Sequence, residues 1–252
     1  MDLPTTFKPI SVTVNRSKPY GWYGGATPHP HRRTCAYSTM SSIAGSCLPR
    51  RVRSVAMILT HRGERPVIPE SAYVAPSAVL CGAVTLGERV RVLHGAVLTA
   101  EDGEIWIGDD VVIMENALVR GRSRHPVSVG NAVLIGPHAH LNGATVEDEV
   151  FIATGASLFP GSIAARGSEV RINSVLHVNS RLMPETIIPI GWIAAGDPAQ
   201  LYSPDQHEEL WQVQAGLDFA GTVYGVPRGT PLRTIMSKQV EFYGAHRDDQ
   251  VI

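Results

Sequence analysis

Cysteine is scarce in this sequence of 252 residues, which contains Cys35, Cys47 and Cys81 and no others. No two of them form a C-x-x-C pair, so we expect neither a disulfide framework nor a thiolate zinc site. The same scarcity favours a reducing cytoplasm as the location of the protein. Long apolar runs are also missing, because no segment approaches the roughly 18 uninterrupted apolar residues of a spanning helix. The first residues lack the apolar core of a secretory signal, and we expect no membrane partner.

A large excess of charge of either sign is absent as well. The 22 basic and 23 acidic residues leave a formal net charge of −1. A nucleic-acid-binding domain usually carries a strong basic excess, so we expect no nucleic-acid partner. Hydrophobic residues make up 44% of the chain and charged residues 18%, which is typical of a globular protein.

Residues 1–56 differ in composition from the rest of the chain. They are rich in serine, threonine, proline and glycine, and contain a single acid, Asp2. Their basic residues are Lys8, Arg16, Lys18, Arg32, Arg33, Arg50, Arg51 and Arg53. We expect a basic, disordered extension, or a misassigned start with Met57 as the true first residue. Two alternatives stay open: an organelle transit peptide rich in arginine and serine, or a basic interaction tail.

From Val74 onward an aliphatic residue returns at every sixth position. The first series is Val74, Leu80, Leu86, Val92 and Leu98, followed after insertions by Ile107, Ile113, Val119, Val129, Ile135 and Leu141. After one five-residue step, the second series is Val146, Ile152, Leu158, Ala164, Val170, Leu176, Leu182, Ile188 and Ala194. A period of six fits neither an α-helix nor an alternating strand, and is typical of short strands joined by tight turns around a solenoid.

Three such hexads make one triangular coil, so that residues about eighteen apart stack on one face. Each coil buries its anchors only against its neighbours, and the main-chain hydrogen bonds run from coil to coil. Two insertions, residues 100–106 and 121–128, interrupt the rhythm. We expect them to project at the corners, where functional loops usually lie. The sequence therefore predicts an all-β solenoid over residues 57–202, a parallel β-helix of hexapeptide repeats.

A helix is predicted after the coils. Ser203 is its expected cap, with Gln206 closing a capping box, and the helix should end at about Gln214. The residues that give it an apolar stripe against the coil wall are Leu210, Val213 and Leu217. We expect residues 203–252 to consist of this helix and a tail, and the sequence says little about the tail.

Four features together resemble the γ-class carbonic anhydrases of the hexapeptide-repeat superfamily. They are the hexad array, the step from Leu141 to Val146, the ending Ile193-Ala194-Ala195-Gly196-Asp197-Pro198-Ala199, and the helix that follows. The match covers about residues 68–214. The resemblance implies a left-handed β-helix, a handedness that the period alone does not give. It also implies a homotrimer in which three histidines hold zinc between adjacent subunits.

The resemblance places the three zinc ligands on Arg120, Pro137 and Asn142, none of which has an imidazole. The family's structural arginine and aspartate, and its glutamine and aspartate before the first ligand, fall on Thr99, Glu101, Met114 and Glu115. Carbon dioxide hydration depends on a metal that lowers the pKa of bound water to about 7. We therefore expect a trimer without the family's zinc centre or its hydratase activity, and we assign no cofactor.

Zinc is predicted only through a rearranged site. Its ligands would come from His94, His140, Glu101 and Glu115, because imidazole and carboxylate groups both bind zinc. In the alternative interpretation, His140 is an exposed turn residue and His94 is a polar group on the surface. Both interpretations stay open.

The second insertion begins with Arg120-Gly121-Arg122-Ser123-Arg124-His125, in which three arginines alternate with other residues. Guanidinium groups bind carboxylate or phosphate through paired hydrogen bonds, and their mutual repulsion favours an anionic partner. That partner is either internal, from Glu101, Asp102 and Glu115, or a small anionic metabolite at the subunit interface. The predicted substrate-binding residues are Arg120, Arg122, Arg124, His125, Glu115 and Asn142.

Three functions stay open. In the first, the trimer binds or acts on a small anion or serves as a structural subunit, and its catalytic residues would be His140, His94 and Glu101. The second is an acyl-CoA-dependent transferase of the hexapeptide family, with His125 or His140 as general base. The third is a lyase that uses the rearranged metal site.

Overall fold

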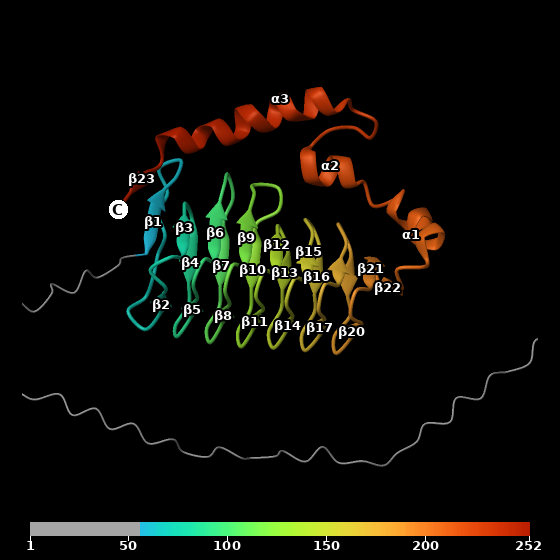
Figure 1. Ribbon diagram of the computed structural model, residues 1–252, viewed down its shortest axis with the longest axis horizontal. Helices are drawn as coiled ribbons and strands as arrows, with labels where there is room; N and C mark the ends of the chain where they lie inside the picture. Colours follow the sequence, from blue (N-terminus) through green and yellow to red (C-terminus); the bar gives the residue numbers. More distant parts are fainter. Residues whose placement is uncertain (1–55) are drawn as a thin grey trace, which may run out of the picture. The chain divides into compact units, whose positions relative to one another are not determined.

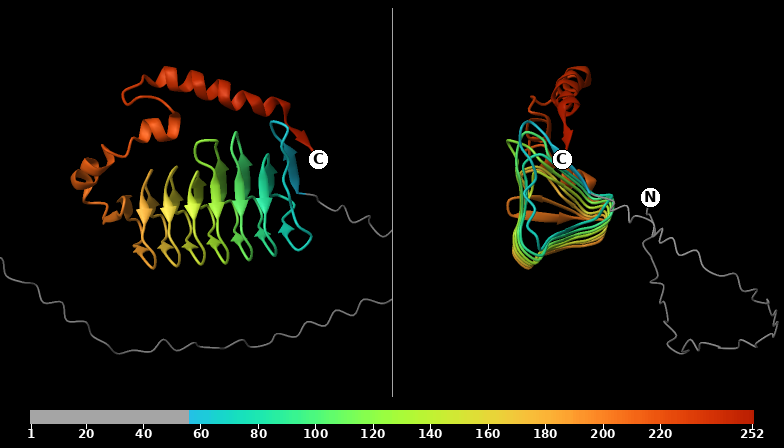
Figure 2. Two further views of the ribbon diagram at one scale, coloured as in Figure 1. Left: turned by 180° about the vertical axis from the view of Figure 1, so that it is seen from behind. Right: turned by 90° about the vertical axis from the view of Figure 1, so that its left-hand side faces the viewer.

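The computed structural model describes residues 56–252, and the predictions made for the segment before them lie outside the described residues. From Met57 to Tyr202 the chain forms a solenoid of short strands, which Figure 1 shows as a row of similar coils. Seen along the solenoid in the right-hand view of Figure 2, the coils are triangular. This parallel β-solenoid confirms the predicted fold class, since it matches a left-handed β-helix of hexapeptide repeats followed by a helix.

Three sheets form the three walls. The ten-stranded sheet contains, in spatial order, β22 (Ala199–Tyr202), β21 (Ile193–Gly196), β18 (Val175–Leu176), β15 (Ser157–Leu158), β12 (His140–Asn142), β9 (Leu118–Gly121), β6 (Val97–Ala100), β3 (Val79–Cys81), β1 (Met57–Thr60) and β23 (Gln250–Val251). The six-stranded sheet contains β19 (Arg181–Leu182), β16 (Ile163–Ala164), β13 (Thr145–Val146), β10 (Val127–Val129), β7 (Ile105–Ile107) and β4 (Val84–Leu86). The seven-stranded sheet contains β2 (Tyr73–Val74), β5 (Arg91–Val92), β8 (Val112–Ile113), β11 (Leu134–Ile135), β14 (Phe151–Ile152), β17 (Glu169–Val170) and β20 (Ile187–Ile188).

The strand register follows the six-residue repeat. Leu98 pairs with Leu80 one coil before it and with Val119 one coil after it, where the first insertion lengthens the coil. Leu141 pairs with Leu158, because the five-residue step shortens the coil between them. Successive side chains of a strand point to opposite faces, so these aliphatic residues all face the interior. They are fully buried there, and together with the other anchors they form one continuous apolar core.

The two insertions form neighbouring loops at one corner. The backbone N–H of Glu101 donates to the carbonyl of Gly121, at 3.0 Å, and Val127 donates to the carbonyl of Glu104, also at 3.0 Å. The first loop lies between β6 and β7, and the second, residues 122–126, lies between β9 and β10. The expected projection of the insertions at a corner is therefore confirmed.

The predicted helix is α1 (His207–Gln214), which contacts β21 and buries Leu210 against the end of the solenoid. Its start differs from the prediction, because the N-cap is Gln206 and not Ser203. The Gln206 side chain accepts a hydrogen bond from the Ser203 backbone N–H at 2.9 Å, and the Gln206 backbone N–H donates to the Ser203 carbonyl at 3.0 Å. These bonds close a separate turn, so the helix begins after it.

The tail contains regular structure that the sequence did not predict. It forms α2 (Phe219–Tyr224), α3 (Leu232–Tyr243), the 3₁₀-helix η1 (Gly244–Asp248) and β23. Figure 1 shows α3 running back along the solenoid toward its first coil. There β23 pairs antiparallel with β1, with Leu59 opposite Val251 and Thr60 opposite Gln250. No helix in residues 56–252 is long and apolar enough to cross a membrane.

Candidate functional site

Polar side chains line the outer face of the ten-stranded sheet, beneath the tail. Cys81 pairs with Thr99, Thr99 pairs with Arg120, and Arg120 pairs with Asn142, each one coil from the next. Each of these residues directly follows an inward aliphatic anchor, so the alternation of the strand points its side chain outward. We call Cys81, Thr99, Arg120 and Asn142 the outer row.

The three positions that the resemblance assigns to zinc ligands lie on two strands and in one turn. Arg120 and Asn142 lie opposite each other on β9 and β12, whereas Pro137 lies in the turn that leads from β11 to β12. Arg120 Nε and Asn142 Oδ1 are buried and make no hydrogen bond within residues 56–252. The donor set does not fit zinc, because guanidinium is a cation without a free lone pair and proline has no side-chain donor.

Glu101, a predicted catalytic residue, is 4% exposed and lies beside Thr99 and Arg120 of the outer row. Its carboxylate accepts a hydrogen bond from Thr99 Oγ1 at 3.1 Å and lies 3.7 Å from Arg120 Nε. On its other side it lies 2.8 Å from Nε2 of His246, a residue of the tail. The guanidinium of Arg120 lies over the ring of Tyr243, 5.8 Å from its centre. Glu101 therefore lies against the guanidinium of Arg120, the hydroxyl of Thr99 and the imidazole of His246. This contact with Arg120 is the internal acidic partner that the sequence analysis kept as one alternative.

His140 lies on the same outer face as Asn142, two residues before it. Its Nε2 is buried and makes no hydrogen bond within the described residues. Burial, together with the positive charge of Arg120, lowers the pKa of His140. The imidazole is therefore neutral near pH 7 and has a free nitrogen, as a general base requires.

His94 and Glu115 lie elsewhere, in a stack of turns that leaves the seven-stranded sheet. The carbonyl of His94 accepts from the backbone of Asn116, and the carbonyl of Glu115 accepts from the backbone of His138. The exposed His94 ring lies 2.8 Å from Ser77 Oγ. Within one chain the structure therefore does not bring His94 and Glu115 to the outer row. The one group of potential metal ligands within residues 56–252 includes none of the four residues expected in a rearranged site.

The arginines of the second loop meet the tail. The guanidinium carbon of Arg122 lies 4.1 Å from the centre of the Phe242 ring, and Arg122 donates to the Val223 carbonyl at 3.4 Å. A cavity of about 240 Å³ opens between this loop and the tail. Its charged and polar lining side chains are Asp102, Arg122, Ser123, Arg124, His125, Thr222 and Tyr224. Burial and the neighbouring Arg124 lower the pKa of His125.

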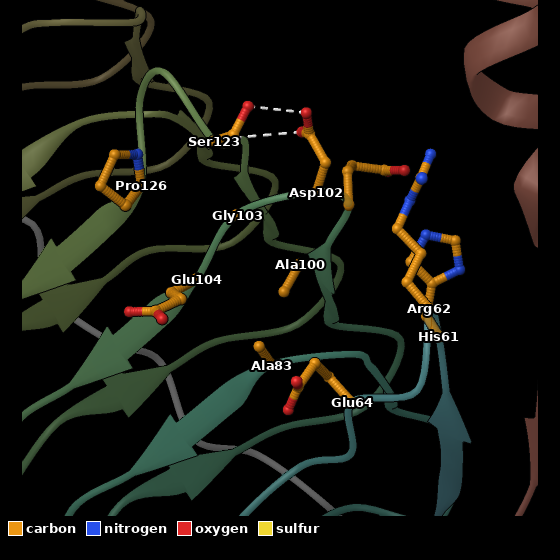
Figure 3. Close-up of a pocket in the computed structure, with 11 residues that line it drawn as sticks. His61, Arg62, Glu64, Ala83, Ala100, Asp102, Gly103, Glu104, Ser123 and Pro126 are labelled. Atoms are coloured by element: carbon orange, nitrogen blue, oxygen red, sulfur yellow. Dashed lines mark hydrogen bonds between the residues drawn. The ribbon is translucent and has the colours of Figure 1, made fainter.

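A second cavity, of about 570 Å³, lies on the other side of the first loop (Figure 3). Its acidic lining residues are Glu64, Glu101, Asp102 and Glu104. Its lining contains one arginine, Arg62, and no lysine. Ser123 donates to Asp102 through its backbone N–H and its hydroxyl, at 3.1 and 2.7 Å, as the dashed lines in Figure 3 show. Burial alone would raise the pKa of Asp102, but these hydrogen bonds and the nearby Arg122 lower it. The two cavities therefore differ in charge, acidic on one side of the loops and basic on the other.

Comparisons with known proteins find γ-carbonic anhydrases among the relatives of this chain. "Gamma carbonic anhydrase 1, mitochondrial" from Arabidopsis thaliana is 33% identical over 151 residues, which cover 58% of this chain and 53% of the relative. A carbonic anhydrase from Geobacillus kaustophilus is 23% identical and covers 63% of this chain and 84% of the relative. In sequence and in fold this chain is γ-carbonic-anhydrase-like, a β-solenoid that resembles the hexapeptide-repeat proteins.

The extent of these matches is limited. The γ-carbonic-anhydrase-like chain spans about half the length of the first curated relatives that it matches. No family model matches its sequence. Among solved structures, a UDP-N-acetylglucosamine acyltransferase from Bacteroides fragilis is 15% identical, with a TM-score of 0.45, and covers 73% of this chain and 98% of the other.

One group of side chains in this γ-carbonic-anhydrase-like chain was missed by the sequence analysis. His61, Cys81, His246 and Asp249 offer ligand atoms that all lie within 4.8 Å of one another. We call these four residues the tail cluster. Burial, followed by the charge of Asp249, raises the pKa of Cys81 to about 12. Burial alone would lower the pKa of His246, but bonds to Asp249 and Glu101 outweigh it and raise the pKa.

The sequence held only part of the signal for this cluster. Cys81 directly follows the anchor Leu80, so the repeat places it in the outer row. His61 precedes the repeat, and His246 and Asp249 belong to the tail, for which the sequence predicted no structure. From the absence of a C-x-x-C pair the sequence analysis expected no thiolate zinc site, an inference that does not bear on a mixed site with one thiol.

Proposed function

We propose that this γ-carbonic-anhydrase-like protein lacks zinc-dependent hydration of carbon dioxide at the family's position and binds a small anion beside the second loop. The observation that carries the proposal is the set Arg120, Pro137 and Asn142 at the three ligand positions. Arg120 and Pro137 offer zinc no ligand atom, and Arg120 adds a permanent positive charge at one of the ligand positions. A fixed positive charge at this place attracts an anion.

The basic cavity supports anion binding. Arg122 and Arg124 line it together with His125, and neither arginine forms an ion pair within 4.0 Å among residues 56–252. Asp102 is the single acid in its lining, and Ser123 occupies its carboxylate with two hydrogen bonds. Two guanidinium groups with free donors can therefore bind a carboxylate or phosphate.

A homotrimer is the proposed assembly. Pro137 lies in a shallow cavity of about 560 Å³ that also contains Phe151, Ile172 and Ile190. These three apolar side chains are 44%, 43% and 60% exposed. An exposed apolar patch of this kind marks an interaction surface, and it surrounds the residue that the resemblance places against a neighbouring subunit. Light scattering of Ile172→Glu, with Lys238→Glu as a surface control, tests it: a trimer that persists in Ile172→Glu contradicts this interface.

Anion binding is tested by titrating the full chain with bicarbonate and with inorganic phosphate, measured by calorimetry. Arg124→Gln removes one donor group of the cavity, and loss of a charged hydrogen bond of about 1.5–3 kcal/mol should weaken binding more than tenfold. The control is Arg233→Gln, because Arg233 is exposed on α3. Equal affinity in wild type and Arg124→Gln would contradict the proposed cavity.

The loss of hydration at the family's position has its own test. Zinc-supplemented protein is assayed for carbon dioxide hydration, and we expect no rate above that of the buffer. Hydration that disappears on the change Asn142→Ala, but persists when Cys81 is replaced, would show that the family's position still works. That result would overturn the proposed loss of hydration, and it would do so whether or not a metal binds near Cys81.

An acyl-CoA-dependent transferase is the second candidate function. The lowered pKa values of His125 and His140 keep both imidazoles neutral, which suits a base that deprotonates an acceptor. Acetyl-CoA at a hundred times its dissociation constant would stabilise the fold by about 2.7 kcal/mol, and a thermal-shift measurement detects this. No shift would remove this candidate.

The cytoplasm is the proposed location, on the scarcity of cysteine alone. The matched Arabidopsis relative carries "mitochondrial" in its name. Fractionation of cells that produce the full chain decides between the two compartments, and recovery with mitochondria would favour the transit-peptide interpretation of residues 1–56.

A further inference from the structure

The tail cluster gathers four potential metal ligands from segments that are far apart in the sequence. His61 follows β1, Cys81 ends β3, and His246 and Asp249 come from η1 and the residue after it. His61 and Asp249 are 188 residues apart, yet His61 Nδ1 lies 2.6 Å from an Asp249 carboxylate oxygen. Cys81 Sγ lies 3.6 Å from the second oxygen, and His246 Nδ1 lies 2.9 Å from it. The carboxylate of Asp249 is thus surrounded by two imidazoles and a thiol.

The cluster is largely buried. The side chains of His61 and Asp249 are 1% and 12% exposed, and Cys81 is 3% exposed. His61 Nε2 is also buried and makes no hydrogen bond within the described residues. A buried ring nitrogen without a partner is costly, so hydrogen bonds within the cluster do not by themselves account for this histidine. The side chain of His246 is 33% exposed, so an ion can enter the cluster on the side of this residue.

Glu101 supplies a second independent feature. Its buried carboxylate lies 2.8 Å from Nε2 of His246, while the other nitrogen of the same ring, Nδ1, faces Asp249. A histidine that binds a metal through one nitrogen usually donates from the other nitrogen to a carboxylate, which fixes its tautomer and orientation. The pair of Glu101 and His246 has this arrangement, with Nδ1 presented to the tail cluster.

We propose that the tail cluster binds one divalent metal ion of the zinc class through His61, Cys81, His246 and Asp249. Thiolate and imidazole ligands favour zinc or cobalt over calcium or magnesium, which prefer oxygen ligands. On binding, Cys81 releases its thiol proton to solvent and coordinates as a thiolate. Four protein ligands complete a tetrahedral zinc site, so the site is structural.

The site differs from the family's zinc site in residues and in place. Cys81 pairs with Thr99, and Thr99 pairs with Arg120, so the tail cluster begins two coils before the first ligand position of the family. Its ligands also come from one chain, because the tail returns to the first coil (Figure 1). The ion would join the two ends of the described chain and hold α3 over the outer row.

The metal content of the full chain, produced without a histidine tag, tests the proposal. The protein is stripped with a chelator, loaded with zinc and measured by mass spectrometry; a second sample is loaded with cobalt and its absorption spectrum is recorded. We expect one bound ion per chain and a thiolate-to-cobalt charge-transfer band. No stoichiometric ion in either sample would overturn the proposal.

Matched variants identify the ligands. Cys81→Ser should remove the charge-transfer band, and Cys47→Ser, a control at another thiol, should keep it. His246→Ala should weaken zinc binding at least tenfold, and His207→Ala, on the exposed start of α1, should leave it unchanged. Equal binding in wild type, Cys81→Ser and His246→Ala would show that the cluster is a hydrogen-bonded contact without metal.

A second readout protects the test against unfolding. Circular dichroism establishes that each variant keeps the solenoid, whose core lies outside the cluster. Zinc should then raise the melting temperature of wild type and Cys47→Ser, and should not raise that of Cys81→Ser or His246→Ala. A rise of the same size in all four proteins would overturn the assignment.

Discussion

The inner and outer faces of the ten-stranded sheet belong to the same strands and have different origins. On the inner face, Leu98 packs against anchors one coil before and one coil after it. On the outer face, the neighbouring Glu101 contacts His246, 145 residues later in the chain. The inner face therefore depends on contacts between adjacent coils, whereas the outer face is completed only when the tail returns. This difference separates what stabilises the fold from what forms the candidate sites.

The largest expected effect compares an inward with an outward side chain within one strand of the seven-stranded sheet. On β20, Ile188 is fully buried and the adjacent Ile187 is 40% exposed. Ile188→Ala leaves a cavity in the core and should lower the free energy of unfolding by about 2–5 kcal/mol. Ile187→Ala should lower it by less than about 1 kcal/mol. Chemical denaturation measures both, and similar losses would mean that the outer face is buried in an interface.

A glycine at the corner between β3 and β4 gives the next largest effect. Gly82 has φ +76°, and a Cβ there would lie 2.5 Å from the carbonyl oxygen of Ala100. Gly63 has a similar φ of +84° but has open space around it. Gly63→Ala adds backbone strain of about 1–2 kcal/mol, and Gly82→Ala should cost more, because the clash is added to that strain. Equal losses of unfolding free energy in Gly63→Ala and Gly82→Ala would show that the backbone near Ala100 shifts to relieve the clash.

The same contrast explains how much the sequence could predict. The anchors fixed the solenoid, its register and the corner loops, because each coil repeats the same local geometry. The spacing of the hexads also accounts for Arg120 lying opposite Asn142, one coil away. The tail carries no repeat, so α3, β23 and the contact between His246 and Glu101 had no signal of their own. The rearranged site was assembled from coil residues alone, and it stays a prediction, because one chain does not bring its residues together.

A pH dependence should distinguish His140 from histidines in solvent. Its pKa is lowered in the folded protein, so the unfolded chain binds more protons as the pH falls below about 6.5. The free energy of unfolding is therefore unaffected above that pH and decreases below it, by less than about 1.4 kcal/mol per pH unit for one histidine. His140→Gln should reduce this slope, and His207→Gln, at an exposed histidine, should not. An unchanged slope in His140→Gln would show that the ring is solvated.

The smallest expected effect tests whether the tail is held to the outer face by specific contacts. Arg122 lies over Phe242 at 4.1 Å, and a cation–π contact of this kind contributes about 0.5–1 kcal/mol near a surface. A double-mutant cycle of Arg122→Met and Phe242→Leu should give a coupling energy of that size, because each change removes one partner and keeps apolar volume. The matched cycle is Arg228→Met with Trp211→Leu, where the guanidinium lies farther from the ring, at 5.7 Å. If the coupling energy is no larger at Arg122 than at Arg228, the contact between α3 and the second loop is not specific. The tail would then be held in place by contacts at its two ends.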